Sequence, residues 1–452
     1  MRSRLILCIP LLLAACAGGP DYRRPDVALP ERFSEAGGEW RGAQPGEFTV
    51  PENWWRVFAD PGLDPLEARV AVDNPNLKAA EARYRAARAA LDSASAARLP
   101  SVTGAAEAGR ARDKGVTANS FAVSASASWE IDVWGRVRRG IEVARARAEA
   151  GAGDLAAARL SAQALLAQTW FQWRAAGEQE ALLRRTLAAY TRFLALTRDR
   201  HDAGVASGLD VAQAETQIGN VSSQISEAEL RRAQLGHALA ALLGGTDVPP
   251  DADGVLPAVP APPVLLPSTW LEQRPDIAAA ERLAAAANAQ IGLARTAFYP
   301  VLDLGAGVGL RSNTLGRLFD APSRLWSLGP GLAMTLFDGG AREAGVEQAR
   351  AGYDQAVAQY RQTVLTAFQE VQDNLAAARL LGREAEEQAR TLAAARRARA
   401  IAEAQYQAGT VNALNVISAQ TAELAAEIGA LNLHARRLDA AVTLLKNAGG
   451  RF

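Results

Sequence analysis

Cysteine is nearly absent from this sequence, and its scarcity excludes a fold held together by disulfides. The two cysteines are Cys8 and Cys16, both near the N-terminus. We expect Cys8 to be removed with a signal peptide and Cys16 to carry lipid, so neither is available for a disulfide. The rest of the 452-residue chain must be stabilised by packing alone, and it is long enough to bury a large core.

Histidine is also scarce, and residues suited to metal binding or catalysis do not occur at useful spacings. His201, His237 and His434 are far apart, and none has a cysteine or carboxylate at a spacing typical of a metal site. The glycine-rich segment 305–309 lies within a strand pattern and opens no helix, unlike a dinucleotide-binding loop. The sequence therefore predicts no catalytic residue, no metal, no cofactor and no enzymatic activity.

The sequence lacks an excess of charge of either sign, and it lacks long hydrophobic runs. Basic and acidic residues number 49 each, so the formal net charge is zero and nothing in the composition favours nucleic acid as a partner. Beyond the N-terminal segment, no apolar stretch is long enough to form a membrane-spanning helix. If the chain crosses a membrane, it does so as β-strands.

The N-terminus has the pattern of a bacterial lipoprotein signal. A positively charged start precedes the apolar run 5–13, and the sequence Leu-Ala-Ala-Cys ends at Cys16. This pattern predicts a signal peptide at 1–15 and lipid on Cys16, and the alternative is an ordinary secretory signal with an incidental cysteine. Ala17 follows in place of the aspartate that usually retains lipoproteins at the inner membrane, which favours the outer membrane.

Two long segments of the sequence repeat each other. Residues 75–100 align with 275–300 without a gap, at an offset of 275 − 75 = 200, and prolines match at both ends. The match resumes between 141–146 and 346–351 at an offset of 346 − 141 = 205. A duplicated unit of helix, β-hairpin, long helix and return helix argues against an enzyme with one active site. The predicted organisation is a signal peptide (1–15), a lipidated extended tether (16–60), a first repeat (61–244), a connection (245–274) and a second repeat (275–452).

Each repeat contains a predicted β-hairpin, at about 101–134 in the first and about 301–337 in the second. Apolar residues alternate with small or polar ones, over strands of about ten residues, as in strands that cross an outer membrane. Four strands cannot close a barrel in lipid, whereas three copies supply 3 × 4 = 12 strands. The strand ends carry tryptophans where a membrane-surface belt is expected, although tryptophan also packs well in soluble cores: Trp129, Trp134 and Trp326.

The helices that follow the hairpins are expected to be very long. From about 139 to 201 the sequence has no proline, which at 1.5 Å per residue gives a helix on the order of 90 Å. A return helix of about 35 residues follows, ending near Leu243. In the second copy the apolar residues follow an eleven-residue period, typical of nearly straight helices in a tube wall, although a plain soluble bundle has similar stripes. That stripe comprises Val346, Ala349, Tyr353, Val357, Tyr360, Val364, Phe368, Val371 and Leu375.

Several motifs resemble the TolC-type outer-membrane efflux family, in its lipoprotein (OprM/NodT-like) branch. They are the lipobox followed by Gly-Pro-Asp-Tyr-Arg-Arg-Pro at 19–25, Arg-Thr-Ala-Phe-Tyr-Pro at 295–300, Phe-Asp-Gly-Gly at 337–340 and an Ala-Gly turn in each copy. The resemblance implies a mainly α fold with membrane β-strands. In that fold a homotrimer forms a 12-stranded outer-membrane β-barrel continued by a long periplasmic α-helical barrel. It also implies a passive exit duct that docks onto a periplasmic adaptor and an inner-membrane RND-type transporter.

The resemblance assigns roles to residues at the two predicted turns. The segments 200–204 and 405–409 match the periplasmic tips that bind adaptors, with Ala203, Gly204, Ala408 and Gly409 in the turns themselves. Leu414, Asn415 and Ser418 fall where the family narrows its entrance. The family often has acidic residues at the last two of these positions, so their absence here predicts weaker block of the closed channel by cations. The resemblance also implies a latch between Tyr406 and Asp210, and the alternative is that both are solvated tip residues.

The sequence therefore predicts the outer-membrane exit duct of a tripartite efflux pump for drugs or other small molecules, anchored by lipid and reaching into the periplasm. Two alternatives stay open. One is an outer-membrane duct for type I protein secretion. The other is a periplasmic scaffold lipoprotein without a pore, against which the alternating, tryptophan-flanked hairpins argue. The exported compound, the cognate adaptor and the cognate pump are not encoded in any recognisable pattern.

Overall fold

A computed structural model describes residues 19–30, 33–35, 53–113, 115–250, 255–261 and 274–448. The predicted signal peptide and Cys16 lie outside these residues. Among the described residues, no helix is both long and apolar enough to cross a membrane. The chain divides into two compact units, which we name by what they contain. The sheet unit comprises Met1–Val27, Ala82–Asp154 and Asp276–Thr363, and the tip unit comprises Ala28–Glu81, Leu155–Pro275 and Val364–Phe452.

The two halves of the chain build helices of equal length. Proline is well suited to the first position of a helix, because an N–H at that position would have no acceptor within the helix. Pro75 and Pro275 occupy this position in α3 and α6. The matching helices confirm the duplication predicted from the sequence offsets. They are α3 (Pro75–Ala96) and α6 (Pro275–Thr296) with 22 residues each, α4 (Arg136–Asp202) and α7 (Ala341–Gln407) with 67 each, and α5 (Gly208–Leu242) and α8 (Ala413–Asn447) with 35 each.

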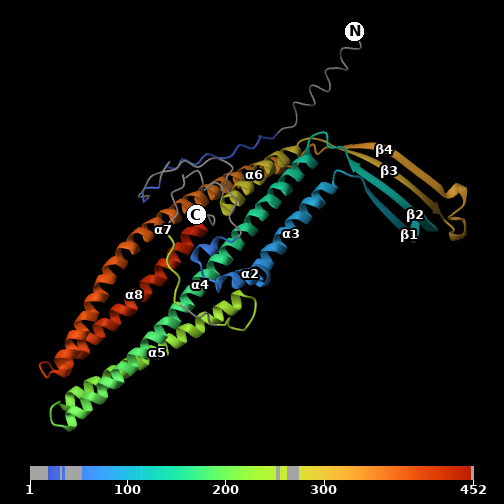
Figure 1. Ribbon diagram of the computed structural model, residues 1–452. Coiled ribbons are helices and arrows are strands. Elements are labelled where there is room, and N and C mark those ends of the chain that lie inside the picture. The colour runs from blue at the N-terminus through green and yellow to red at the C-terminus, as the bar shows by residue number, and fades with distance from the viewer. Residues whose placement is uncertain are drawn as a thin grey trace. The chain divides into compact units, whose positions relative to one another are not determined.

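The sheet unit contains one antiparallel sheet in the order β1-β2-β3-β4, shown at the right of Figure 1. Its strands are β1 (Ser101–Asp113), β2 (Val116–Glu130), β3 (Val301–Ser312) and β4 (Arg324–Ala333). Two short 3₁₀ helices, Leu315–Arg317 and Ala321–Ser323, lie between β3 and β4. The two hairpins of the duplicated halves thus join directly, through the pairing of β2 with β3.

The register of this sheet separates apolar from small and polar side chains. Residues directly opposite one another share a face, and Ala125, Val308 and Trp326 form one such row. The next row on the other face consists of Ser126, Gly307 and Ser327. Large side chains of the apolar face are open to the surroundings, with Val308 61% and Trp326 80% exposed. An exposed, continuous apolar face is what strands facing lipid require.

The tryptophans near the strand ends divide into two kinds. Trp129 and Trp326 lie on the apolar face, one near the end of β2 and one near the start of β4. Trp134 lies beyond β2, and its ring stacks on Tyr299 with centroids 5.2 Å apart. Trp134 therefore packs at the junction of strand and helix, whereas the other two have the positions expected of a membrane-surface belt.

The predicted apolar stripe of α7 is the side of the helix that is protected from solvent. All of its nine residues are buried or half-buried, including Tyr360 and Val364 at 3% and 5% exposure. An eleven-residue period brings every third or fourth residue to one face of a nearly straight helix. The sequence period therefore identified the packed face of α7 correctly over residues 346–375.

Part of the predicted N-terminal tether packs along helices in an extended conformation. In the sheet unit, Asn288 Nδ2 donates to the carbonyl of Pro20 at 2.9 Å, and Arg24 Nε donates to Tyr360 Oη at 3.0 Å. In the tip unit, the ring of Phe33 stacks on Phe368 with centroids 4.9 Å apart. Residues 20–30 form no helix or strand, in keeping with their proline-rich sequence.

The core of the tip unit forms where a short helical corner meets α4, α5 and α8. The 3₁₀ helix η1 (Trp54–Phe58) and α2 (Leu63–Asp73) supply one side of this core. A buried ion pair joins the corner to α4, because Arg174 contacts the carboxylate of Asp60. The core residues that are at most 2% exposed are Phe58, Leu63, Val70, Ala164, Leu166, Ala167, Trp170, Phe171, Leu239, Leu243, Leu438, Val442 and Leu445.

Candidate functional site at the two helix turns

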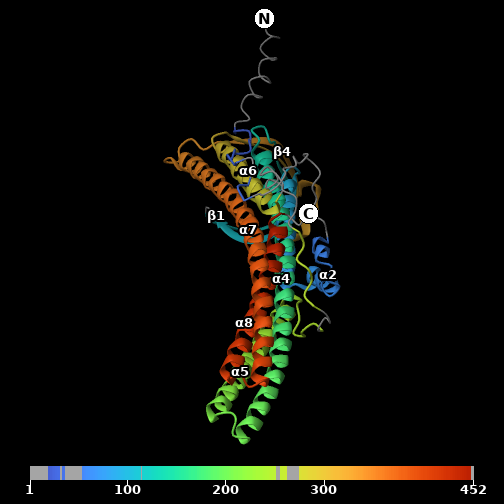
Figure 2. The same cartoon turned by 60° about the vertical axis from the view of Figure 1, so that its left-hand side comes forward.

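The candidate site comprises two helix hairpins of the tip unit. The turn between α4 and α5 lies beside the turn between α7 and α8, as both views show (Figures 1 and 2). Hydrogen bonds from Arg200 to the carbonyls of Tyr406 and Gln407 connect the two turns. The two predicted adaptor-binding segments therefore form one continuous surface.

Both turns have the same hydrogen-bond geometry, with a glycine in the left-handed conformation. Gly204 and Gly409 adopt φ angles of 77° and 75°. In the first turn, Gly204 N donates to His201 O at 2.8 Å and Val205 N donates to Arg200 O at 2.8 Å. In the second turn, Gly409 N donates to Tyr406 O and Thr410 N donates to Gln405 O, each at 3.0 Å. These bonds satisfy carbonyls that a helix end leaves open, and the left-handed residue is readily supplied by glycine. Ala203 and Ala408, which immediately precede these glycines, also lie in the turns.

The helices that leave the two turns begin differently. Ser207 caps α5, its hydroxyl accepting from Asp210 N at 3.2 Å while the Asp210 carboxylate accepts from Ser207 N at 2.9 Å. This reciprocal capping box satisfies two open donors. At α8, Asn412 Oδ1 accepts from Asn415 N at 3.3 Å, and the described bonds include no return bond from the Asn415 side chain. Asp210 and Asn415 occupy equivalent positions, because 415 − 210 = 205.

Tyr406 lies inside the tip unit and is only 4% exposed. Its hydroxyl lies 3.5 Å from Thr197 Oγ1, and its ring centroid lies 5.3 Å from that of Phe193. The Asp210 carboxylate bonds to Ser207 instead. Among the described residues, the structure of one chain does not join Tyr406 to Asp210, and the predicted latch between them stays a prediction.

The three predicted gate residues form one exposed edge of α8. Leu414 is 47% exposed, and Asn415 and Ser418 are exposed as well. The residues between them turn inward, with Val416 fully buried and Ile417 5% exposed. Because Val416 and Ile417 pack inside their own subunit, the side chains of the three predicted gate residues point away from its other helices.

Arg200 is a residue of this site whose role the sequence did not reveal. Its guanidinium donates to Tyr406 O at 2.7 Å and to Gln407 O at 3.0 Å, and its central carbon lies 4.4 Å from the centroid of the Tyr406 ring. The sequence placed Arg200 in the tip segment only. The sequence did place Arg200 in the last turn of a predicted helix, where a cation interacts favourably with carbonyls that have no partner in the helix. In the structure, however, the carbonyls that Arg200 binds belong to α7 and not to its own helix α4.

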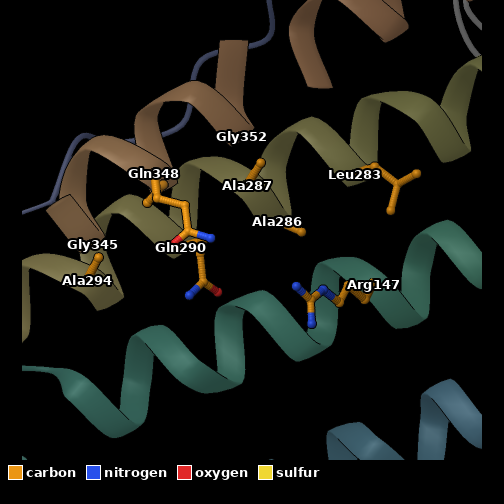
Figure 3. Close-up of a pocket in the computed structure, with 10 residues that line it drawn as sticks. Arg147, Leu283, Ala286, Ala287, Gln290, Ala294, Gly345, Gln348 and Gly352 are labelled. Carbon is orange, nitrogen blue, oxygen red and sulfur yellow. The ribbon is translucent and has the colours of Figure 1, made fainter. Parts of the chain in front are cut away.

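A separate cavity of about 410 Å³ lies in the sheet unit between α4, α6 and α7. Figure 3 shows Arg147 from α4, Gln290 from α6 and Gln348 from α7 around it. The remaining lining residues are glycine, alanine and one leucine, so the lining offers no carboxylate, hydroxyl, thiol or imidazole. Acid–base or nucleophilic catalysis needs such groups, and this cavity does not provide them.

Comparisons with known proteins agree with this fold. The chain matches the family described as "Outer membrane efflux protein" over residues 68–245 and 266–450. It is 34% identical to outer membrane protein OprJ of Pseudomonas aeruginosa, over 98% of this chain and 95% of that protein. It is 31% identical to cation efflux system protein CusC of Escherichia coli, over 99% of this chain and 98% of that protein.

Solved structures show the same fold. A crystal structure of CusC superposes with a TM-score of 0.86 at 30% identity, over 96% of this chain and 99% of that one. The Campylobacter jejuni CmeC outer membrane channel gives a TM-score of 0.87 at 25% identity, over 96% of this chain and 95% of that one.

The duplicated helices, the exposed sheet and these similarities define an outer-membrane efflux channel of the tripartite type. Such a channel extends into the periplasm and carries out no enzymatic reaction. The chain belongs to the outer membrane efflux protein family, and its fold is the TolC-like fold that the sequence resemblance implied.

Proposed function

We propose that this protein works as a trimeric exit duct that opens at its periplasmic tips. The observation that carries the trimer is the sheet, in which β1 and β4 are paired on one side only. Open strand edges are not tolerated in lipid, so further copies must cover them. Three copies bring the sheet to 3 × 4 = 12 strands, with the apolar face toward lipid and the serine- and glycine-rich face toward the lumen.

The proposed partners are a periplasmic adaptor and an inner-membrane RND-type transporter. The adaptor would dock on the paired turns around Gly204 and Gly409, which the contacts of Arg200 join into one surface. The proposed cargo is drugs or other small molecules, in line with relatives whose names specify cation and toluene efflux. Lipid on Cys16 would add an anchor in the outer membrane.

Gly409→Pro tests the role of the tips. Proline fixes φ near −65° and lacks an N–H, whereas this position has φ 75° and donates to Tyr406 O at 3.0 Å. We expect dye and drug accumulation in a deletion strain to fall with the native gene and to stay several-fold higher with Gly409→Pro. Gly409→Asn is the matched control, because asparagine tolerates the left-handed region and a Cβ here meets no atom within 4 Å.

The outcomes separate the proposals. Restored efflux with Gly409→Pro, at equal protein level in the outer membrane, would contradict the docking role of this turn and leave the channel intact. No effect of the deletion itself on any dye, drug or metal would contradict small-molecule efflux and favour secretion of protein.

The predicted gate residues determine how strongly divalent cations should block the closed channel. Asn415 and Ser418 carry no charge, so we expect divalent cations to block the closed trimer weakly. Conductance of the reconstituted trimer in a planar bilayer, with and without divalent cations, measures this. The matched variant Asn415→Asp combined with Ser418→Asp should raise the block, because it places carboxylates on the exposed edge of α8. Strong block of the native trimer at low cation concentration would contradict the prediction.

A further inference from the structure

The sheet has two ends, and the long helices connect to one of them. Helices α3 and α6 lead into β1 and β3, and β2 and β4 lead into α4 and α7, all at the same end of the sheet (Figure 1). The opposite end, which we call the outer end, carries the turn between β1 and β2 and the connection from β3 to β4. Because a channel of this family extends its helices into the periplasm, the outer end of the sheet faces away from the periplasm.

At the starts of α4 and α7, arginines are paired with carboxylates of the same chain. Arg138 Nε lies 3.3 Å from Asp132 Oδ2, and Arg342 Nε lies 2.5 Å from Asp338 Oδ2. Each of these arginines therefore has its counter-charge within the chain, at the end of the sheet where the helices connect.

Four arginines at the outer end have no such partner. Within the described part of the chain, their side chains form no ion pair and no hydrogen bond, and all four are exposed. Segments 110–116 and 313–324, which contain them, hold five basic and two acidic residues, a formal charge of 5 − 2 = +3. The outer end therefore offers positive charge to a partner outside the chain. The four residues are Arg110 and Arg112 at the end of β1, Arg317 between β3 and β4, and Arg324 at the start of β4.

The register of the sheet places arginines on the apolar face, directly after an aromatic residue in each hairpin. In the first hairpin, Phe121 is opposite Ala108, and Arg110 follows two positions farther out on the same face. In the second hairpin, Trp326 is followed by Arg324, again two positions farther out on the same face. Aromatic side chains are typical of the boundary between the apolar layer and the headgroups of a membrane. The arginines therefore lie at the level of the headgroups.

The connection between β3 and β4 adds apolar side chains to this surface. Leu315 is 60% exposed and Phe319 is 74% exposed, and Arg317 lies between them in the sequence. A free anion would need only the positive charge. A lipid that has both acyl chains and an anionic headgroup matches the apolar and the positive groups together.

Closure of the barrel brings the arginines of the two hairpins together. β1 and β4 are the two edges of the sheet in one chain. In the proposed trimer, β1 of one copy pairs with β4 of the next, so Arg110 and Arg112 share a seam with Arg324 of the next copy. Guanidinium groups gathered in this way repel one another, and an anion between them relieves the repulsion. Phosphate is the anion that arginine binds best, through two parallel hydrogen bonds.

From this arrangement we propose that the outer end of the barrel binds the phosphate groups of lipopolysaccharide, the phosphorylated glycolipid of the outer leaflet, at each seam between subunits. Arg110 and Arg324 contact the phosphates, and Leu315 and Phe319 contact the acyl chains. The proposal rests on the proposed trimer, and it adds a lipid ligand that passive conduction of small molecules does not itself require.

The test is the binding of lipid A, the phosphorylated anchor of lipopolysaccharide, to the purified full-length trimer in detergent, titrated by native mass spectrometry. Arg110→Gln combined with Arg324→Gln should weaken binding on the order of twentyfold, since each arginine near an anionic lipid surface contributes about fivefold. The same two positions changed to lysine keep the charge but lose the planar contact, so binding should be intermediate. The matched control for Arg324→Gln alone is Arg311→Gln. Arg311 is exposed near the outer end of β3 but lies opposite Ala122 on the lumen face, so its loss should leave binding unchanged.

Two further ligands test the proposal on the native trimer, without any variant. Lipid A from which the phosphates have been removed should bind about as weakly as intact lipid A binds the double glutamine variant. Inorganic phosphate at millimolar concentration should not displace lipid A, because it has no acyl chains. Equal binding of lipid A with and without its phosphates, an equal loss with Arg311→Gln, or displacement by inorganic phosphate would overturn the proposal. The same spectra report the oligomeric state, so a native protein that is not a trimer would count against the proposed function instead.

Discussion

Replacing Asp60 with alanine is expected to lower the free energy of unfolding of the tip unit by about 3–5 kcal/mol, the usual cost of removing one partner of a buried ion pair. The Asp60 and Arg174 side chains are 1% and 7% exposed. The Asp60 carboxylate also accepts from Gly62 N at 2.9 Å and from Trp170 Nε1 at 3.4 Å. The variant thus removes the counter-charge of a buried guanidinium and the acceptor of two further donors.

The measurement is thermal unfolding of the detergent-solubilised trimer, followed by helical circular dichroism. Glu215→Ala is the control, because its ion pair with Arg198 is about half exposed on both sides and exposed pairs contribute about 0–1 kcal/mol. We expect a clear fall in the unfolding temperature for Asp60→Ala and almost none for Glu215→Ala. Equal effects of the two variants would show that the buried pair does not stabilise the corner formed by η1 and α2.

Glu67 is expected to destabilise the same core at neutral pH. It lies on α2 with 0% exposure, and within the described part of the chain neither carboxylate oxygen has a hydrogen-bond partner. Burial raises the pKa of Glu67 to about 9, with a smaller contribution from the charge of Asp64. Folding at neutral pH therefore requires that this carboxyl take up a proton, at a cost of about 1.4 kcal/mol for each pH unit above its ordinary pKa.

The direction of the pH effect follows from proton binding. Between the ordinary pKa of a glutamate and about 9, the folded chain holds a proton at Glu67 that the unfolded chain has lost, so the contribution of this group to stability falls as pH rises. Glu67→Leu should raise the stability of the tip unit at pH 7 by as much as about 3 kcal/mol. Glu67→Gln should likewise remove this pH dependence. Unfolding curves of the native and variant trimers between pH 5 and 9 test this, and parallel profiles for the native and both variant proteins would contradict it.

The sequence was sufficient to predict the architecture because its signals are periodic and repeated. The offsets of 200 and 205 between the halves, the alternation in the hairpins and the eleven-residue stripe of α7 each extend over many residues. The alternation and the stripe both arise because the apolar side chains of a strand or helix must lie on the one face that is turned away from water. The fold class and the membrane role followed from these patterns together with the family motifs, and the structural comparisons confirm both.

Residue-level contacts at the tips were less predictable because they depend on pairs far apart in the chain. Nothing in the local sequence indicates that Arg200 reaches the carbonyl of Tyr406, which lies 206 residues away. Likewise, the family resemblance implied Tyr406 as a partner of Asp210, and it gave no sign that the Asp210 carboxylate also caps its own helix in the structure of one chain. A capping box can be recognised from Ser207 and the acidic residue three positions later, and that local signal was available in the sequence.

The unequal caps of the two return helices have a consequence for mechanics. α5 starts with two reciprocal bonds between Ser207 and Asp210, whereas α8 starts with one bond at 3.3 Å between Asn412 and Asn415. Missing cap interactions lower the free energy needed to unwind a first turn by roughly 1 kcal/mol. Leu414 and Asn415 lie in that first turn of α8. In the proposed duct, these residues would place the helix end that frays more readily at the entrance, so the bore there would depend on a local helix–coil equilibrium as well as on the tilt of whole helices.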